Sequence, residues 1–171
     1  MWPDTILRAA MSFPDWLRLN CMTDDRSTEI PDHPPMPQPD MAALDRLVGS
    51  WEVTGGVRGT TAYEWMEGRF FLVQHVDLEH DGRRIKGMEI IGHLQPFGEA
   101  PSEDICSRYY GSVGDTLDYV YELEADTLTI WGGEKGSPAY YRGTFNEGGS
   151  VCAGARVYPG GGYRSTMTRM T

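Results

Sequence analysis

Three polar side chains lie within a largely hydrophobic stretch of this chain, where they could bind a ligand or take part in chemistry: Gln74, Glu89 and His93. A carboxyl group and an imidazole on one strand face are the groups that general acid–base catalysis uses. A glutamate in an apolar interior also has its pKa raised by desolvation, as catalytic carboxylates often do. This pattern favours an isomerase or cyclase that acts on an apolar substrate. The simpler interpretation is that Glu89 only hydrogen-bonds Gln74.

Other kinds of chemistry find little support in the sequence. The chain contains no nucleophile elbow, no phosphate-binding Walker loop and no H-E-x-x-H motif. A metal site needs three or four converging ligands. The hairpin register below directs two of the four histidines, His75 and His93, to opposite faces, while His80 falls at a hairpin tip and His33 far outside the strands. We therefore expect neither a metal nor a cofactor.

The amino-acid composition indicates the cellular compartment and argues against some classes of binding partner. The formal net charge is -10 and the isoelectric point is about 4.8, so nucleic acid and anionic membrane surfaces are poor partners. The cysteines Cys21, Cys106 and Cys152 are odd in number and far apart, which favours free thiols in a reducing compartment. No segment has the roughly 18 apolar residues of a membrane span, and no secretory signal is evident. We expect a cytoplasmic protein.

The hairpin at Asp81-Gly82 decides where the polar side chains point. This dipeptide separates two alternating runs and favours a two-residue turn, which places Gln74 opposite Glu89. One face of the resulting strand pair is mostly apolar and is expected to face inward. That face is formed by Phe70, Leu72, Gln74, Val76 and Leu78 with Ile85, Gly87, Glu89, Ile91 and His93.

A second hairpin, at Ala125-Asp126, adds aromatic groups to the interior. It places Tyr119 and Tyr121 on the apolar face of its strands, where each phenol needs a hydrogen-bond partner. Together the two hairpins predict a set of side chains that border a ligand. These are Trp65, Phe70, Leu72, Gln74, Glu89, Ile91, His93, Tyr119 and Tyr121.

The elements that position these groups are short strands. From Ser50 onward the sequence alternates with period two and is interrupted by turn residues, which predicts about ten strands. They lie near 50–58, 60–67, 69–79, 84–95, 103–111, 115–124, 127–132, 137–146, 150–158 and 162–170. The connections are too short for crossover helices, so neighbouring strands must be antiparallel. The class is all-β, and an up-and-down barrel is favoured because closure removes both sheet edges; a two-sheet sandwich is the alternative.

Residues 1–40 differ from the rest and are predicted to form an extension, with a short helix near Phe13 to Leu19 and a proline-rich strap. The extension could serve as a lid or as the arm of a homodimer. The barrel domain is expected over 41–171. It opens with a helix from Asp40 to Val48, capped by Asp40 and ended by Gly49. Met41, Leu44, Leu47 and Val48 form the apolar face of this helix.

The run Leu47-Val48-Gly49-Ser50-Trp51-Glu52, which closes this helix and opens the first strand, resembles the Gly-x-Trp start of the calycin (lipocalin-like) superfamily. The resemblance covers roughly residues 41–171. It implies that Gly49 and Trp51 are structural, and that Trp51 packs at the closed end of the barrel against a basic residue of the last strand. Arg169 is the matching candidate.

Within the superfamily the chain is most similar to an uncharacterised bacterial group known as the domain of unknown function 1579 family. The similar stretches include Thr61-Ala62-Tyr63-Glu64-Trp65, Thr127-Leu128-Thr129-Ile130-Trp131 and Pro159-Gly160-Gly161-Gly162-Tyr163. The chain is more distantly similar to nitrobindins, which hold haem through a histidine near the C-terminus. No histidine follows His93, so the resemblance does not extend to haem binding.

A barrel of about ten strands is too wide for side chains alone to fill, since eight-stranded barrels already hold one small ligand. The leading hypothesis is therefore a protein that binds a small hydrophobic or amphipathic molecule in its lumen. An isomerase or cyclase using Glu89 and His93 is one alternative. A structural or interaction module with a filled barrel is the other.

Overall fold

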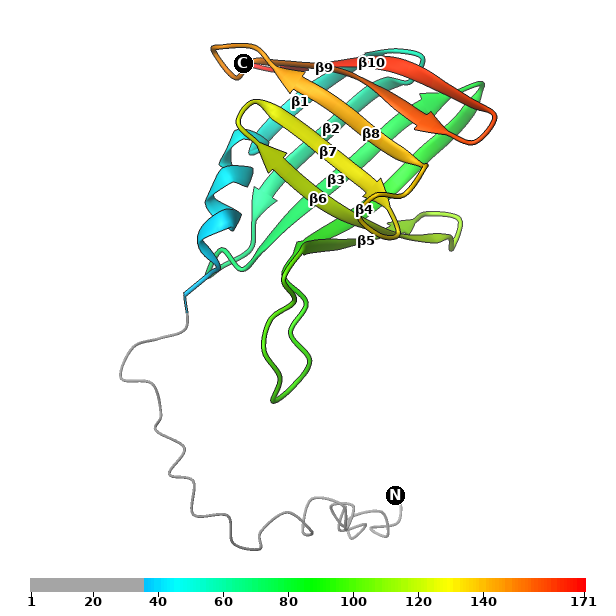
Figure 1. Ribbon diagram of the computed structural model, residues 1–171. Helices are drawn as coiled ribbons and strands as arrows, with labels where there is room; N and C mark the ends of the chain where they lie inside the picture. The colour runs from blue at the N-terminus through cyan, green and yellow to red at the C-terminus, as the bar shows by residue number, and fades with distance from the viewer. Residues whose placement is uncertain (1–35) are drawn as a thin grey trace, which may run out of the picture. The chain divides into compact units, whose positions relative to one another are not determined.

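A computed structural model describes residues 36–171, and the predicted helix near Phe13 to Leu19 lies outside this range. The described part is a closed barrel of ten antiparallel strands preceded by one short helix (Figure 1). Each strand pairs with the next along the chain, and the first pairs with the last. The predicted all-β, ten-stranded up-and-down barrel is confirmed. No helix in this part is long and apolar enough to cross a membrane.

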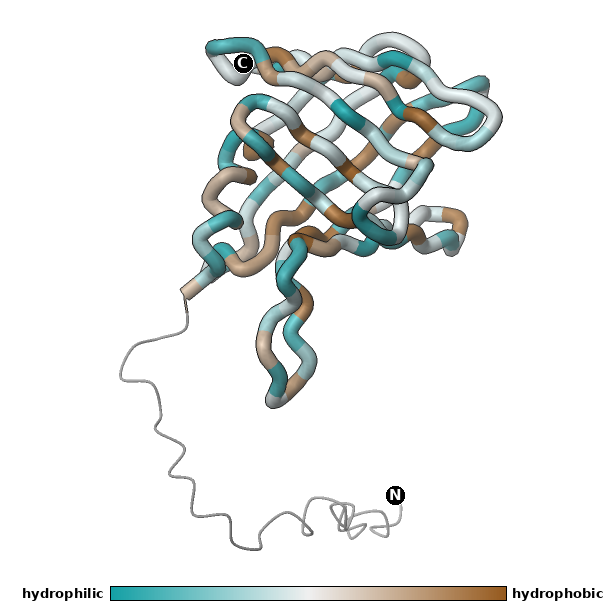
Figure 2. Tube along the Cα trace, in the orientation of Figure 1, coloured by the Kyte–Doolittle hydropathy of each residue, from teal (hydrophilic) through white to brown (hydrophobic). Residues whose placement is uncertain are grey.

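The ten strands lie close to their predicted ranges, and the ends differ by three residues at most. They are β1 (Gly49–Gly55), β2 (Arg58–Trp65), β3 (Phe71–His80), β4 (Arg83–Gly92), β5 (Ile105–Gly111), β6 (Thr116–Glu124), β7 (Thr127–Gly132), β8 (Tyr140–Phe145), β9 (Val151–Tyr158) and β10 (Gly161–Arg169). Hydrophobic and hydrophilic residues alternate along the strands (Figure 2), which is typical of a sheet with one buried face.

Both hairpins have the predicted register. Asp81 and Gly82 adopt left-handed backbone angles, with φ of 50° and 74°, as a two-residue turn between twisted strands requires. Gln74 consequently lies opposite Glu89. At the β6–β7 turn Ala125 has a φ of 51°, and Leu123 faces Leu128.

The helix η2 (Pro39–Arg46) is a 3-10 helix, and its predicted apolar face is buried: Met41, Leu44 and Leu47 belong to the core. The predicted N-cap is wrong. Pro39 begins the helix, since its fixed φ suits the first turn, so Gln38 occupies the cap position and makes no side-chain cap. Asp40 lies one residue inside the helix.

One end of the barrel is closed by residues at the start of β1 and at the end of β10. Trp51 is fully buried, and the Arg169 guanidinium carbon lies 4.2 Å from the centre of its ring. Arg169 also donates hydrogen bonds to the carbonyl oxygens of Val48 and Arg46. A Cβ at Gly49 would lie 2.8 Å from Nη1 of Arg169, and the φ of Gly49 is +116°. A side chain at position 49 would therefore both strain the backbone and displace Arg169.

Arg169→Met should lower the free energy of unfolding by about 2–3 kcal/mol, because it leaves the Val48 and Arg46 carbonyls without their charged donor. Urea denaturation followed by tryptophan fluorescence measures this. Arg164→Met is the matched control, since Arg164 is an exposed arginine on the same strand, and it should change stability by less than about 0.5 kcal/mol. Equal effects of the two substitutions would show that Arg169 does not hold the closed end together.

Candidate functional site

The barrel encloses a cavity of about 380 Å³, within the range of roughly 300–1,000 Å³ typical of small-molecule sites. Its walls are mostly apolar. They include Val53, Val57, Val76, Leu78, Ile85, Leu117, Leu128, Ile130 and Met167. Leu117 and Ile85, at the end away from the helix, reach solvent, whereas Trp51, Leu72 and Ile91 at the helix end are fully buried. The cavity therefore opens at one end.

Glu89 is the buried acidic group of this cavity, with 5% of its surface exposed. Its Oε1 accepts hydrogen bonds from Ser107 Oγ and, at 2.9 Å, from Tyr121 Oη. Oε2 has no donor among residues 36–171, and no side-chain oxygen or nitrogen of these residues is both buried and unpaired. Oε2 is therefore accessible from the cavity. Loss of solvation on burial raises the pKa of Glu89, because it opposes ionisation more than the two hydrogen bonds favour it.

Gln74 belongs to a separate hydrogen-bond cluster beside Glu89. Its Nε2 donates to Thr61 Oγ1 and to Tyr63 Oη, both at 2.9 Å. Burial raises the pKa of the Tyr63 phenol, so it keeps its proton. The predicted hydrogen bond between Glu89 and Gln74 is not formed. Although the two residues face each other in the register, each is satisfied by the strand on its other side.

The other predicted ligand contacts divide into two groups. Tyr119 and Tyr121 line the cavity together with Gln74 and Glu89, as the two hairpins imply. The cavity wall does not include Trp65, Phe70, Leu72, Ile91 and His93. These lie at or near the helix end. Leu72 and Ile91 are part of the fully buried core there, and Trp65 Nε1 donates to Asp45 Oδ1 of the helix at 2.7 Å.

His93 has a different environment from Glu89. Its Nδ1 lies 2.6 Å from the carbonyl oxygen of Ser102, and its Nε2 lies 3.0 Å from Asp40 Oδ1. The ring thus links η2 to the loop between β4 and β5. His93 does not line the cavity that contains Glu89, and a catalytic role for the pair stays a prediction. His93 follows the end of β4, whereas Glu89 lies within this strand.

Arg156 also lines the cavity, and the sequence analysis missed it. It lies half-buried on β9 opposite Tyr163, and its guanidinium carbon is 5.1 Å from the centre of the Tyr119 ring. A signal was present in the sequence. Interpreting Pro159-Gly160 as a two-residue hairpin would have paired Arg156 with Tyr163 and placed it on the same face as Ser165.

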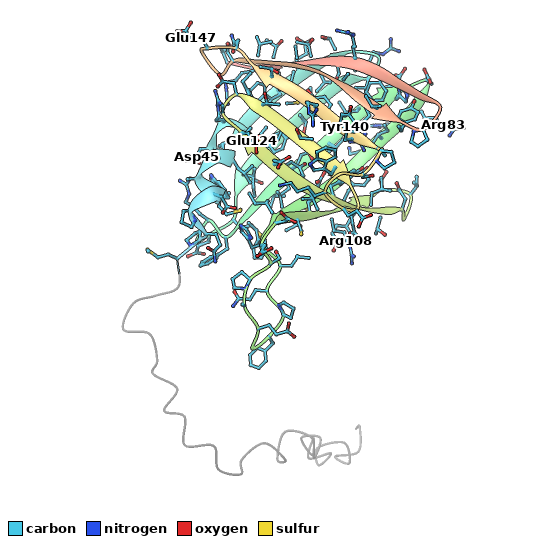
Figure 3. All side chains as sticks on the ribbon, in the orientation of Figure 1. Asp45, Arg83, Arg108, Glu124, Tyr140 and Glu147 are labelled. Carbon is cyan, nitrogen blue, oxygen red and sulfur yellow. The ribbon has the colours of Figure 1, made fainter. Side chains whose placement is uncertain are left out.

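Charged side chains on the outside of the barrel form ion pairs with one another. Arg108, labelled in Figure 3, lies 2.6 Å from Asp118, and Arg84 lies 2.7 Å from Asp77. These arginines lower the pKa of their aspartate partners, so the exposed carboxylates stay ionised. The lumen differs because Glu89 and Arg156 form no ion pair within 4 Å with any residue of 36–171.

Two comparisons with known proteins identify no relative of this chain. No protein-family model matches the chain, and a search of curated proteins finds no match. The fold class therefore rests on the ten-stranded barrel itself.

Glu89→Gln should stabilise the protein above about pH 4.5 and increasingly so toward neutral pH. In the folded state the raised pKa of Glu89 keeps the proton bound, while the unfolded chain releases it at the ordinary value. The contribution of Glu89 to stability is thus fully present at low pH and is lost as the pH rises toward the folded pKa. The difference between the two proteins should grow by up to about 1.4 kcal/mol per pH unit.

Urea denaturation of both proteins between pH 4 and 8 measures this difference. The amide oxygen of the substituted side chain can still accept hydrogen bonds from Ser107 and Tyr121, so the comparison isolates the ionisation. Parallel stability profiles would mean that Glu89 ionises as readily in the fold as in the unfolded chain.

Proposed function

We propose that this protein binds a small amphipathic molecule in the lumen of a calycin-like barrel. The observation that carries the proposal is a cavity of about 380 Å³ with apolar walls and a few inward polar groups. Binding sites for small molecules combine these two features, since apolar walls supply affinity and a few polar atoms fix orientation. A barrel filled by its own side chains would leave no such space.

The polar groups favour an amphipathic ligand over a purely hydrophobic one. Glu89 Oε2 is accessible from the lumen, and the Arg156 guanidinium lines the same space. A hydrocarbon would remove water from both groups without replacing its hydrogen bonds, which is costly. A ligand with a polar group directed toward them avoids that cost.

The other features of the chain support a calycin-like binding protein in a reducing compartment. Trp51 and Arg169 meet at the sealed end, which is the contact that the resemblance to calycins implies. Cys106 and Cys152 are free thiols, which supports a cytoplasmic setting. We add no catalytic role to the proposal.

The neutral dye N-phenylnaphthylamine should bind saturably with enhanced fluorescence, and Ile85→Trp should weaken this binding by about tenfold or more. Ile85 lies at the open end of the cavity, where an indole would occupy the entrance. Fluorescence titration measures the affinity.

Met88→Trp is the matched control. Met88 lies on the same strand but faces outward and is 40% exposed, so the dye affinity should stay unchanged. Absence of saturable binding to the folded, unaltered protein would overturn the proposed function. An equal loss in both variants would show that the dye binds outside the lumen.

A further inference from the structure

Arg156 places a permanent positive charge inside the barrel. It lies between Tyr163 of β10 and Tyr141 of β8 in the strand register, and its guanidinium group faces the ring of Tyr119. These three tyrosines line the cavity with it. An arginine at this position is costly unless an anion or several acceptors compensate its lost hydration.

The described part of the chain supplies no such anion. The ion pairs of residues 36–171 leave Arg156 out, although they include Arg46, Arg58, Arg69, Arg84 and Arg108. No side-chain nitrogen in this part is both buried and unpaired, so any guanidinium donor of Arg156 without a protein acceptor is exposed to solvent. Arg156 itself lines the cavity, so a ligand in the lumen can reach its guanidinium group.

Neither acidic residue of the cavity wall, Glu89 or Asp115, forms an ion pair with Arg156. Burial raises the pKa of Glu89 in spite of the opposing effect of Arg156, so desolvation dominates at this carboxyl. Asp115 lies at the exposed β5–β6 turn, where its side chain packs against Gly111. Its charge is screened by solvent, and the ion pairs of residues 36–171 do not join it to Arg156.

We propose that the ligand is a small organic carboxylate whose anionic group pairs with Arg156 while its apolar body lies among the aliphatic walls of the lumen. This inference rests on the proposed binding function and names the chemical class of the ligand. A guanidinium group offers two parallel donors that match the two oxygens of a carboxylate. A cationic ligand would be repelled by Arg156, and a neutral ligand would leave the guanidinium without a counter-charge.

The tyrosines beside Arg156 complete the site. Burial raises the pKa of Tyr119 and of Tyr163, so both phenols keep their protons and can donate to an anion. The Tyr119 ring also covers one side of the guanidinium, which limits its freedom and lowers the entropic cost of pairing.

The acidic surface does not exclude an anionic ligand. The net charge of -10 is spread over the whole chain, and at physiological ionic strength such charges are screened beyond about 8 Å. Inside the lumen the dielectric constant is lower, so the nearest charge dominates the interaction. For a bound carboxylate that charge is the guanidinium group of Arg156.

The test compares two probes of nearly the same shape, naphthaleneacetate and the neutral naphthaleneacetamide, by displacement of N-phenylnaphthylamine. The unaltered protein should bind the carboxylate about tenfold or more tightly than the amide, since a charge-assisted pair is stronger than a neutral hydrogen bond. Arg156→Gln should abolish this preference, so that the carboxylate and the amide bind with nearly equal affinity. Arg156→Lys should retain part of it.

Arg142→Gln is the matched control, because Arg142 lies on the adjacent strand but faces outward over Trp131. It should leave the preference intact. Equal binding of the two probes by the unaltered protein, or a preference that survives Arg156→Gln, would overturn the carboxylate proposal while dye binding still supported the lumen as a binding site. If the dye itself does not bind, the proposed function fails instead. The comparison in the unaltered protein decides the question even if the Arg156 variants do not fold.

Discussion

The contact between the first and last strands is the constraint on which the rest of this structure depends. Pairing β1 with β10 closes the sheet and removes its edges, so every strand has two neighbours. At the helix end of this seam Arg169 covers Trp51 and binds the backbone carbonyls that precede β1. One arginine thus connects the helix, the first strand and the last strand.

Because one end is closed, the two halves of the barrel interior differ in how completely side chains fill them. Toward η2 the interior is filled by fully buried residues such as Leu44, Leu72 and Ile91. Toward the other end the barrel is wider than its side chains can fill, and the cavity remains. The difference arises because the helix contributes additional apolar side chains to one end only.

Several polar side chains of the lumen are hydrogen-bonded to one another. Gln74 binds Thr61 and Tyr63, while Glu89 Oε1 binds Ser107 and Tyr121. Mutual satisfaction keeps these buried groups compatible with a stable core. Among the groups that it leaves available to a ligand are the second oxygen of Glu89 and the guanidinium group of Arg156.

The sequence by itself determined the class of the fold, the number of strands and the register of two hairpins. Turn dipeptides and period-two alternation are local signals, and each follows from the geometry of neighbouring residues. They placed Glu89, Gln74, Tyr119 and Tyr121 inside the barrel. Only the tertiary structure decided which inward residues border the cavity and which form the sealed end, and it separated His93 from Glu89. It also revealed Arg156 as an arginine in the lumen that forms no ion pair with the described residues. The physical reason is that depth in the barrel and the partner of a buried polar atom depend on strands far apart in the chain, whereas alternation reports only the face on which a residue lies.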